Sequence, residues 1–143
     1  MLADAAAAET RSFIATADRI SETDGWIEHT GSIWRLAEDV VFRARVCVAE
    51  VAANLLEHGG ARVGGDEMSV TLRPSGNALE IELSDTGRAF DPTASPAAMP
   101  APDGSGGRGL RLLRAYATVM TYRRDGGRNI LSLRVAPAHR GAA

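Results

Sequence analysis

The stretch "EMSVTLRPSGNALEIELSD", residues 67–85, decides the fold. Apolar and polar residues alternate on both sides of a central Ser-Gly-Asn, which is the period of a β-strand with one buried face. The Ser-Gly-Asn itself is typical of a tight turn, so the stretch predicts a hairpin. On its second strand, Leu79, Ile81 and Leu83 should point together into the core.

On either side of this hairpin, hydrophobic periodicity and turn residues predict the remaining elements. They are a strand over 10–16, helices over 19–36, 37–58 and 108–117, and strands over 119–124 and 129–135 joined by Asp-Gly-Gly. The second helix has a continuous apolar face: Val41, Ala44, Val48, Ala52 and Leu55. Because the strands are mostly linked by hairpins, the order favours a two-layer α+β sandwich over a doubly wound parallel sheet. We expect a mixed, mostly antiparallel sheet with about three helices on one face.

Composition limits the classes of function. With 143 residues, of which 45% are hydrophobic and 24% charged, the chain fits one soluble domain. A net charge of -2 gives no cationic field, so nucleic acid and anionic membrane are not expected as partners. A small ligand or another protein is the expected partner. The N-terminal residues have no signal-peptide pattern, and a cytoplasmic protein is expected. One cysteine and three histidines give no metal-ligand spacing.

A glycine-rich stretch, "DGSGGRG" at residues 103–109, fits the spacing G-x-G-x-x-G of phosphate-binding loops. All 16 basic residues are arginines, and the sequence contains no lysine. A Walker P-loop and the usual protein-kinase fold both need a lysine on the phosphates, so both are excluded. A dinucleotide-binding loop follows a strand, whereas the stretch before these glycines is the proline-rich "TASPAAMPAP".

Two further polar groupings are candidates for chemistry. Glu50 and Asn54 lie one turn apart on the helical face opposite the core stripe, in a row with Arg43 and Glu57. Taken alone, such a row is most simply a solvated helix face. Asp85 ends a strand, with Gly87 two residues later. This pattern is typical of an ordinary turn, and it also presents a carboxylate that can accept an exocyclic amine such as that of adenine.

Together, these signals resemble a known family. Glu50-x-x-x-Asn54, Asp85-x-Gly87 and Gly107-x-Gly109-Leu110 occur in the order of the N, G1 and G2 boxes of the histidine-kinase-like (GHKL or Bergerat) ATPase superfamily. "AEVAANLLEHG", "DTGRAFDP" and "GGRGLRLLRAYA" are most similar to the bacterial anti-sigma factor serine/threonine kinases. The resemblance covers roughly residues 10–135. It implies one ATPase domain over residues 1–143, with flexible ends at 1–9 and 137–143.

The resemblance also implies roles for individual residues. Asn54 matches the asparagine that holds Mg²⁺ on the ATP phosphates, and an amide oxygen suits that hard cation. Glu50 matches the general base that takes the proton of the attacking hydroxyl. Asp85 matches the acceptor of the adenine amino group, and Gly87 lets the backbone approach the base. Asn129 lies where relatives carry a threonine that contacts adenine through water.

The resemblance changes how the glycine-rich stretch is interpreted. Gly107, Arg108, Gly109 and Leu110 would open a helix, so that free N–H groups and the helix dipole face the phosphates. The preceding loop is rich in proline and small residues and cannot form a regular element. We predict that residues 91–107 form a lid over the ATP.

The function implied is an ATP- and Mg²⁺-dependent protein serine kinase of the anti-sigma type. It would bind a sigma factor, phosphorylate a STAS-domain anti-anti-sigma protein, and form a homodimer as its relatives commonly do. Two alternatives remain at this point. One is a nucleotide-dependent module that sequesters partners without phosphorylating them, against which Glu50 argues; the other is an ATPase with a conformational output.

Overall fold

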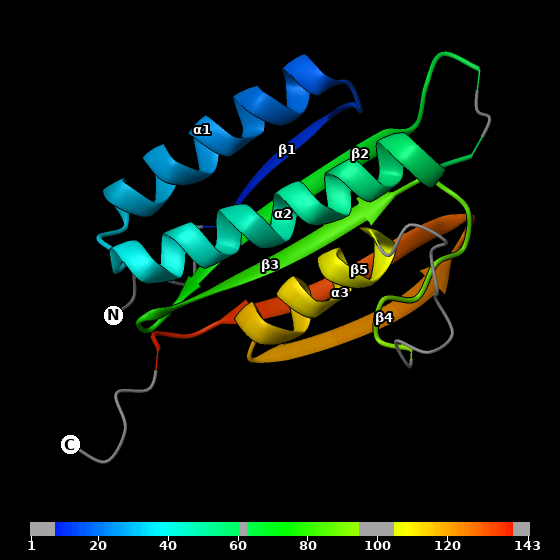
Figure 1. Ribbon diagram of the computed structural model, residues 1–143. Helices are drawn as coiled ribbons and strands as arrows, with labels where there is room; N and C mark the ends of the chain where they lie inside the picture. The colour runs from blue at the N-terminus through cyan, green and yellow to red at the C-terminus, as the bar shows by residue number, and fades with distance from the viewer. Residues whose placement is uncertain (1–7, 61–62, 95–104, 139–143) are drawn as a thin grey trace.

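In the computed structural model, which describes residues 8–60, 63–94 and 105–138, five strands and three helices follow the predicted order (Figure 1). The elements are β1 (Glu9–Ile14), α1 (Ala17–Ile33), α2 (Glu38–His58), β2 (Glu67–Ser75), β3 (Ala78–Asp85), α3 (Ser105–Tyr116), β4 (Val119–Asp125) and β5 (Arg128–Val135).

The strands form one sheet in the order β1-β2-β3-β5-β4, and the three helices lie over one of its faces (Figure 1). The stretch 67–85 is the predicted hairpin, with Ser75 paired to Ala78 across the turn. The predicted α+β sandwich is confirmed, with every pairing between the described strands antiparallel rather than mostly so.

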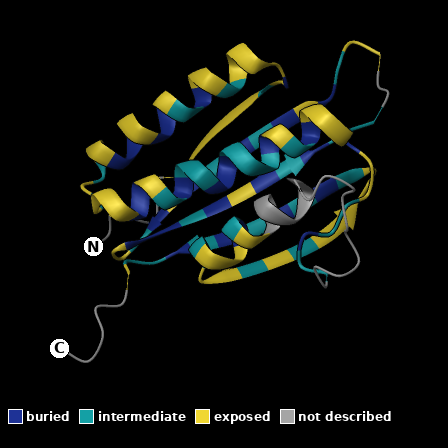
Figure 2. Ribbon diagram, viewed as in Figure 1, coloured by how far each residue is buried: buried dark blue, intermediate teal, exposed yellow. Residues whose placement is uncertain are grey.

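The core fills the space between the helices and the covered face of the sheet. Leu79, Ile81 and Leu83 are each no more than 2% exposed, as the alternation predicts. The whole predicted apolar face of α2 is also buried: Val41, Ala44, Val48, Ala52 and Leu55. Figure 2 shows this alternation as buried segments on the inner side of the helices and strands. Burying one aliphatic side chain of this size stabilises a fold by about 1.5–3 kcal/mol, so these positions hold α2 on the sheet.

Helix α2 lies between the other two helices and contacts both. Toward α1, Arg45 donates to Asp24 at 2.8 Å. The helices approach closely at Gly31, where an added Cβ would lie 2.6 Å from a methyl carbon of Val41. Toward α3, Arg43 donates to the backbone carbonyl of Tyr116 at 3.2 Å.

Strands β4 and β5 are joined by a two-residue turn. Gly126 and Gly127 have φ values of 58° and 78°, which glycine adopts without steric cost. A two-residue turn of this kind matches the twist of a hairpin and fixes its register. Asp125 therefore pairs with Arg128, and Arg124 pairs with Asn129.

Two element boundaries differ from the predictions by three residues, and the others agree to within two. The first helix ends at Ile33 rather than at residue 36, because Arg35 takes a left-handed conformation with φ 58° and reverses the chain. Helix α3 begins at Ser105, three residues before the predicted start at Arg108. Most of the predicted lid, residues 95–104, lies outside the described residues, as do 1–7 and 139–143 of the predicted flexible ends.

Candidate functional site

The predicted site residues come from four elements that meet at one end of the sandwich. The C-terminal half of α2, the end of β3, the beginning of β5 and the beginning of α3 all lie at the right-hand end in Figure 1. Antiparallel pairing of β3 with β5 places Asp85 directly opposite Asn129. The structure thus brings together residues that are far apart in the sequence.

Asp85 is 8% exposed, and its two carboxylate oxygens differ in their surroundings. Oδ1 accepts two hydrogen bonds, from the backbone N–H of Gly87 at 2.9 Å and from Nδ2 of Asn129 at 2.9 Å. Within the part of the chain that the structure describes, no hydrogen bond reaches Oδ2. One oxygen is therefore held by the protein, and the other remains able to accept a hydrogen bond from a ligand.

Asn129 is buried, and the protein engages both ends of its amide. Besides Asp85, Nδ2 donates to the carbonyl oxygen of Arg88 at 2.8 Å. Oδ1 accepts from the backbone N–H of Phe90 at 3.2 Å, from the Tyr122 hydroxyl at 2.5 Å and from the Arg124 guanidinium at 3.1 Å. Because its hydrogen-bonding capacity is used by the protein, Asn129 orients Asp85 and the following loop.

Gly87 packs against the last turns of α2. An added Cβ would lie 2.7 Å from Cδ1 of Leu55, 3.1 Å from Oδ1 of Asp85 and 3.5 Å from Cα of Gly59. Glycine is needed here because the loop touches the side chain of Leu55 in the last turns of the helix. This contact holds the loop that carries Asp85 against α2.

The loop after β3 is also tied to the beginning of β2. The Thr86 hydroxyl donates to Oδ1 of Asp66 at 3.1 Å, and the backbone N–H of Glu67 donates to the same hydroxyl at 2.9 Å. Asp66 is a buried carboxylate beside Gly59. These bonds fix the loop from the side opposite Asn129.

Glu50 and Asn54 are half-buried on the side of α2 that faces α3. Arg43, in the same helical row, marks that side because its guanidinium reaches Tyr116 at the end of α3. Among the described residues, neither Glu50 nor Asn54 has a hydrogen-bond partner. Both side chains are therefore available to a ligand that lies between α2 and α3.

Cys47 lies on the same side of α2 but is fully buried. Burial raises the pKa of its thiol to about 11; the charge of Arg43 opposes this shift, and that of Glu50 adds to it. A thiol with so high a pKa is not a nucleophile near neutral pH. Cys47 is thus a packing residue.

The glycine-rich stretch enters the site through the beginning of α3. Since the helix begins at Ser105, Gly107 lies in its first turn, where backbone N–H groups have no intrahelical partner. Gly109 lies two residues further along, at the start of the second turn, and the side chains of Arg108 and Leu110 are outside the description. Further along α3, Arg114 donates to the carbonyl oxygens of Pro92 and Ala94 and so holds the chain that follows Asp91.

The sequence interpretation missed the residues that orient Asn129, namely Tyr122 and Arg124 on β4. A signal for Arg124 was present: a two-residue Gly-Gly turn between Asp125 and Arg128 places the preceding residue opposite Asn129. Arg124 also donates to the carbonyl oxygen of Gly87 at 2.8 Å. It therefore connects β4 to the loop after Asp85.

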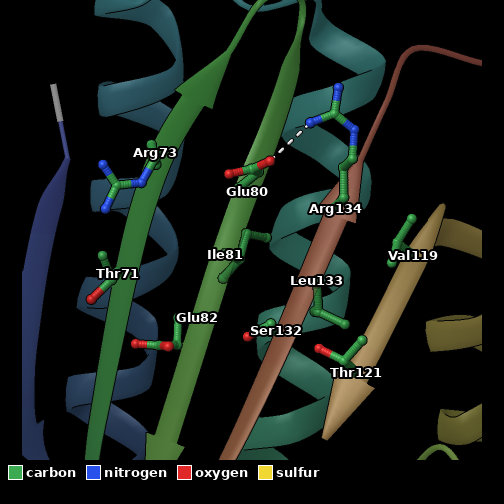
Figure 3. A pocket seen from close by; sticks show the side chains of 10 residues that line it. All are labelled: Thr71, Arg73, Glu80, Ile81, Glu82, Val119, Thr121, Ser132, Leu133 and Arg134. Carbon is green, nitrogen blue, oxygen red and sulfur yellow. Dashed lines mark hydrogen bonds and ion pairs between the residues drawn. The ribbon is translucent and has the colours of Figure 1, made fainter. Parts of the chain in front are cut away.

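A hollow of about 380 Å³ lies elsewhere, on the sheet face away from the helices (Figure 3). Its lining comes from β2, β3, β5 and β4 and contains none of the predicted site residues. The central ion pair, Glu80 with Arg134 at 3.0 Å, is satisfied within the sheet. We therefore place the candidate site at the end of the sandwich, where half-buried polar side chains without partners in the described part of the chain gather.

The described residues contain neither a metal-binding cluster nor a membrane-spanning helix. No group of three or more His, Cys, Asp and Glu side chains in residues 8–60, 63–94 and 105–138 could hold a metal ion by itself. Of the helices in those same ranges, none is long and apolar enough to cross a membrane.

Comparison with known proteins agrees with this architecture. Residues 13–135 match the family described as histidine kinase-like ATPase domain. The serine/threonine-protein kinase BtrW of Bordetella bronchiseptica is 29% identical over 129 residues, which are 87% of this chain and 91% of that protein.

One of the similar solved structures shows the same fold. The SiaB-SiaC complex from Pseudomonas aeruginosa superposes with a TM-score of 0.58 at 10% identity, over 89% of this chain and 88% of that one. The histidine kinase domain from the Erythrobacter litoralis EL346 blue-light activated histidine kinase has 24% identity and a TM-score of 0.45, and the match covers 68% of this chain and 44% of that one.

Proposed function

The chain belongs to the histidine kinase-like ATPase domain family, and on that premise we propose that it is an ATP- and Mg²⁺-dependent protein serine kinase of a bacterial partner-switching system. It would phosphorylate a serine of a STAS-domain anti-anti-sigma protein and would bind the sigma factor that this protein releases. The similarity to a serine/threonine-protein kinase of nearly the same length supports this proposal.

One observation carries the proposal: Glu50 and Asn54, which have no hydrogen-bond partner among the described residues, belong to the same end of the sandwich as the open oxygen of Asp85. Gly87 fixes the loop that carries Asp85 against this helix, because it lies against both Leu55 of α2 and the Asp85 carboxylate. An adenine whose amino group donates to Oδ2 of Asp85 would have its phosphates toward Asn54 and the beginning of α3. The first-turn N–H groups of α3 and its positive dipole end favour an anion there.

Mg²⁺ would neutralise phosphate charge when bound. No described cluster of carboxylates could hold it alone, but the amide oxygen of Asn54 is a hard ligand without a protein partner. Mg²⁺ commonly takes one or two protein ligands and completes its shell with phosphate oxygens and water. The donor set therefore fits a cation that binds together with the nucleotide.

Glu50, one turn before Asn54, fits the role of general base. The partner's serine oxygen would attack the γ-phosphorus while the bond to the β–γ bridging oxygen breaks, and the serine proton would pass to the Glu50 carboxylate. Phosphoserine and ADP are the products. Glu50 is half-buried and accepts no hydrogen bond from the described residues, so its oxygens are free for this proton.

The decisive experiment incubates the protein with Mg-ATP and the STAS-domain protein encoded nearest its gene, and measures phosphoserine by mass spectrometry. We expect transfer by the wild type and its loss in Glu50→Gln with ATP binding retained. Asn54→Ala should lose Mg²⁺-dependent ATP binding as well. Glu57→Gln is the matched control, because it changes an exposed glutamate on the same helix and should leave transfer intact.

Some outcomes would contradict the kinase. ATP binding without transfer to any such partner would favour the sequestration module, and ATP hydrolysis without transfer would favour an ATPase with a conformational output. Binding of the sigma factor and formation of a homodimer are further parts of the proposal. Size-exclusion chromatography with light scattering, with and without the sigma factor, tests both.

A further inference from the structure

The carboxylate of Asp85 has one oxygen engaged by the protein and one that is open, and this asymmetry bears on which base the site selects. We propose that Arg124 and Tyr122 are positioning residues that lock the Asn129 amide, so that Asp85 offers a single acceptor and the site selects adenine over guanine. This inference rests on the proposed function, because it assumes that a nucleotide binds at Asp85.

Adenine and guanine differ in the hydrogen bonds that they can offer to the Asp85 carboxylate. Adenine carries an amino group at position 6, which donates one hydrogen bond, whereas guanine carries a carbonyl acceptor at that position. A guanine that turns to present its ring N–H and its amino group offers two adjacent donors, which pair with both oxygens of a carboxylate. At Asp85 this pairing is blocked, since Oδ1 already accepts from Gly87 and Asn129.

The amide of Asn129 keeps Oδ1 occupied only if its nitrogen faces Asp85. An asparagine amide can turn over and exchange its nitrogen and oxygen. Here the Tyr122 hydroxyl and the Arg124 guanidinium both donate to Oδ1 of Asn129, and a reversed amide would point its own N–H groups at these donors. The two β4 side chains, together with the backbone N–H of Phe90 and the carbonyl oxygen of Arg88, therefore fix the orientation that occupies Oδ1 of Asp85.

Arg124 has a second contact that supports this role. It donates to the carbonyl oxygen of Gly87 at 2.8 Å, so one guanidinium holds both Asn129 and the loop that follows Asp85. Its neighbour Arg123 belongs to the opposite face of the strand, opposite Ile130, and makes no hydrogen bond or ion pair with the described residues. Arg123 is therefore a matched control for Arg124.

The experiment measures dissociation constants for three nucleotides by displacement of a fluorescent ATP analogue. The nucleotides are ATP, GTP and purine riboside triphosphate, which lacks the 6-amino group. The proteins are the wild type, Arg124→Ala, Tyr122→Phe and the control Arg123→Ala. Thermal unfolding without nucleotide is recorded for each variant.

We expect the wild type to prefer ATP to GTP by at least about 100-fold, because a site built around one hydrogen bond rejects a base that leaves it unpaired. Arg124→Ala should weaken the binding of ATP by about tenfold, which is the order expected for loss of a hydrogen bond to a charged group. GTP should bind to this variant at least as tightly as to the wild type, because one of the two bonds that close Oδ1 to guanine is loosened, and purine riboside triphosphate should bind to it as it does to the wild type. Tyr122→Phe should change ATP affinity in the same direction, and Arg123→Ala should change nothing.

If Arg124 and Tyr122 had a merely structural role, their replacement would weaken the binding of all three nucleotides equally, in proportion to the loss of thermal stability. That result would overturn the inference. An Arg124→Ala variant with an unchanged preference for ATP over GTP would overturn it as well. In either case ATP still binds and transfer to the partner can still occur, so the kinase proposal would stand. If the base preferences change as expected but no transfer is found, the kinase fails and the inference holds. A wild type that binds no nucleotide would refute both.

Discussion

Replacing Gly87 by alanine tests whether the loop after Asp85 must touch α2. The new methyl carbon would lie 2.7 Å from Cδ1 of Leu55, well inside van der Waals contact, and 3.1 Å from Oδ1 of Asp85. Leu55 can yield only by repacking in the core, and overpacking of this kind costs about 1–3 kcal/mol. Asp85 is held by Asn129, so the loop must move away from the helix. We expect the free energy of unfolding to fall by about 1–3 kcal/mol, and ATP affinity to fall at least about tenfold, which corresponds to about 1.4 kcal/mol.

Urea unfolding and ATP titration measure the two effects. Leu55→Val shortens the side chain that the methyl group would meet, so the double variant should lose less stability than the sum of the two single changes. Gly25→Ala is the control, because nothing lies within 4 Å of a Cβ at that position. Additive losses in the double variant, or wild-type ATP binding by Gly87→Ala, would refute the argument that this contact positions the carboxylate.

Three further outcomes can be checked on the same protein. In urea unfolding, Gly25→Ala should stabilise by about 0.5–1 kcal/mol, because an exposed helical glycine is replaced by the best helix former, while Gly31→Ala should destabilise by about 1–3 kcal/mol through its clash with α2. The thiol of Cys47, with its pKa raised to about 11, should react with a thiol reagent at pH 8 only as fast as the protein unfolds. Arg43 holds the pKa of Asp39 below its ordinary value of 3.8, so the stability this pair contributes is present above that pH and is lost as the pH falls. Asp39→Asn should therefore destabilise by less than about 1 kcal/mol at pH 7, since the carboxylate is 47% exposed, and its effect should shrink as the pH falls through the lowered pKa of Asp39.

The elements of this fold were predictable because each carries a strong local signal. Alternation with Leu79, Ile81 and Leu83 on one face gave the central strand, and the apolar stripe of α2 gave its buried side. The end of α1 was not predictable, because it depends on a left-handed Arg35, a conformation for which sequence would favour glycine or asparagine. Periodicity therefore extended the helix too far.

The candidate site was predictable in its residues but not in its connections. Spacing placed Glu50 and Asn54 on one helical face, and Asp85 at a strand end. Spacing could not show that only one oxygen of Asp85 is open, because that depends on a partner 44 positions away in the sequence, Asn129. Contacts of this kind depend on strand register, which is a property of the folded sheet.

The β4–β5 turn is part of the site for the same reason. Its two glycines set a register in which Arg124 pairs with Asn129, and side chains alternate between the faces of a strand. A slip of one residue would bring Arg123 to the helix side and turn Arg124 toward the uncovered face. The Asn129 amide would then lose a donor, and the loop after Asp85 would lose the bond to its Gly87 carbonyl. A turn that contacts no predicted ligand thus determines how the acceptor carboxylate is presented.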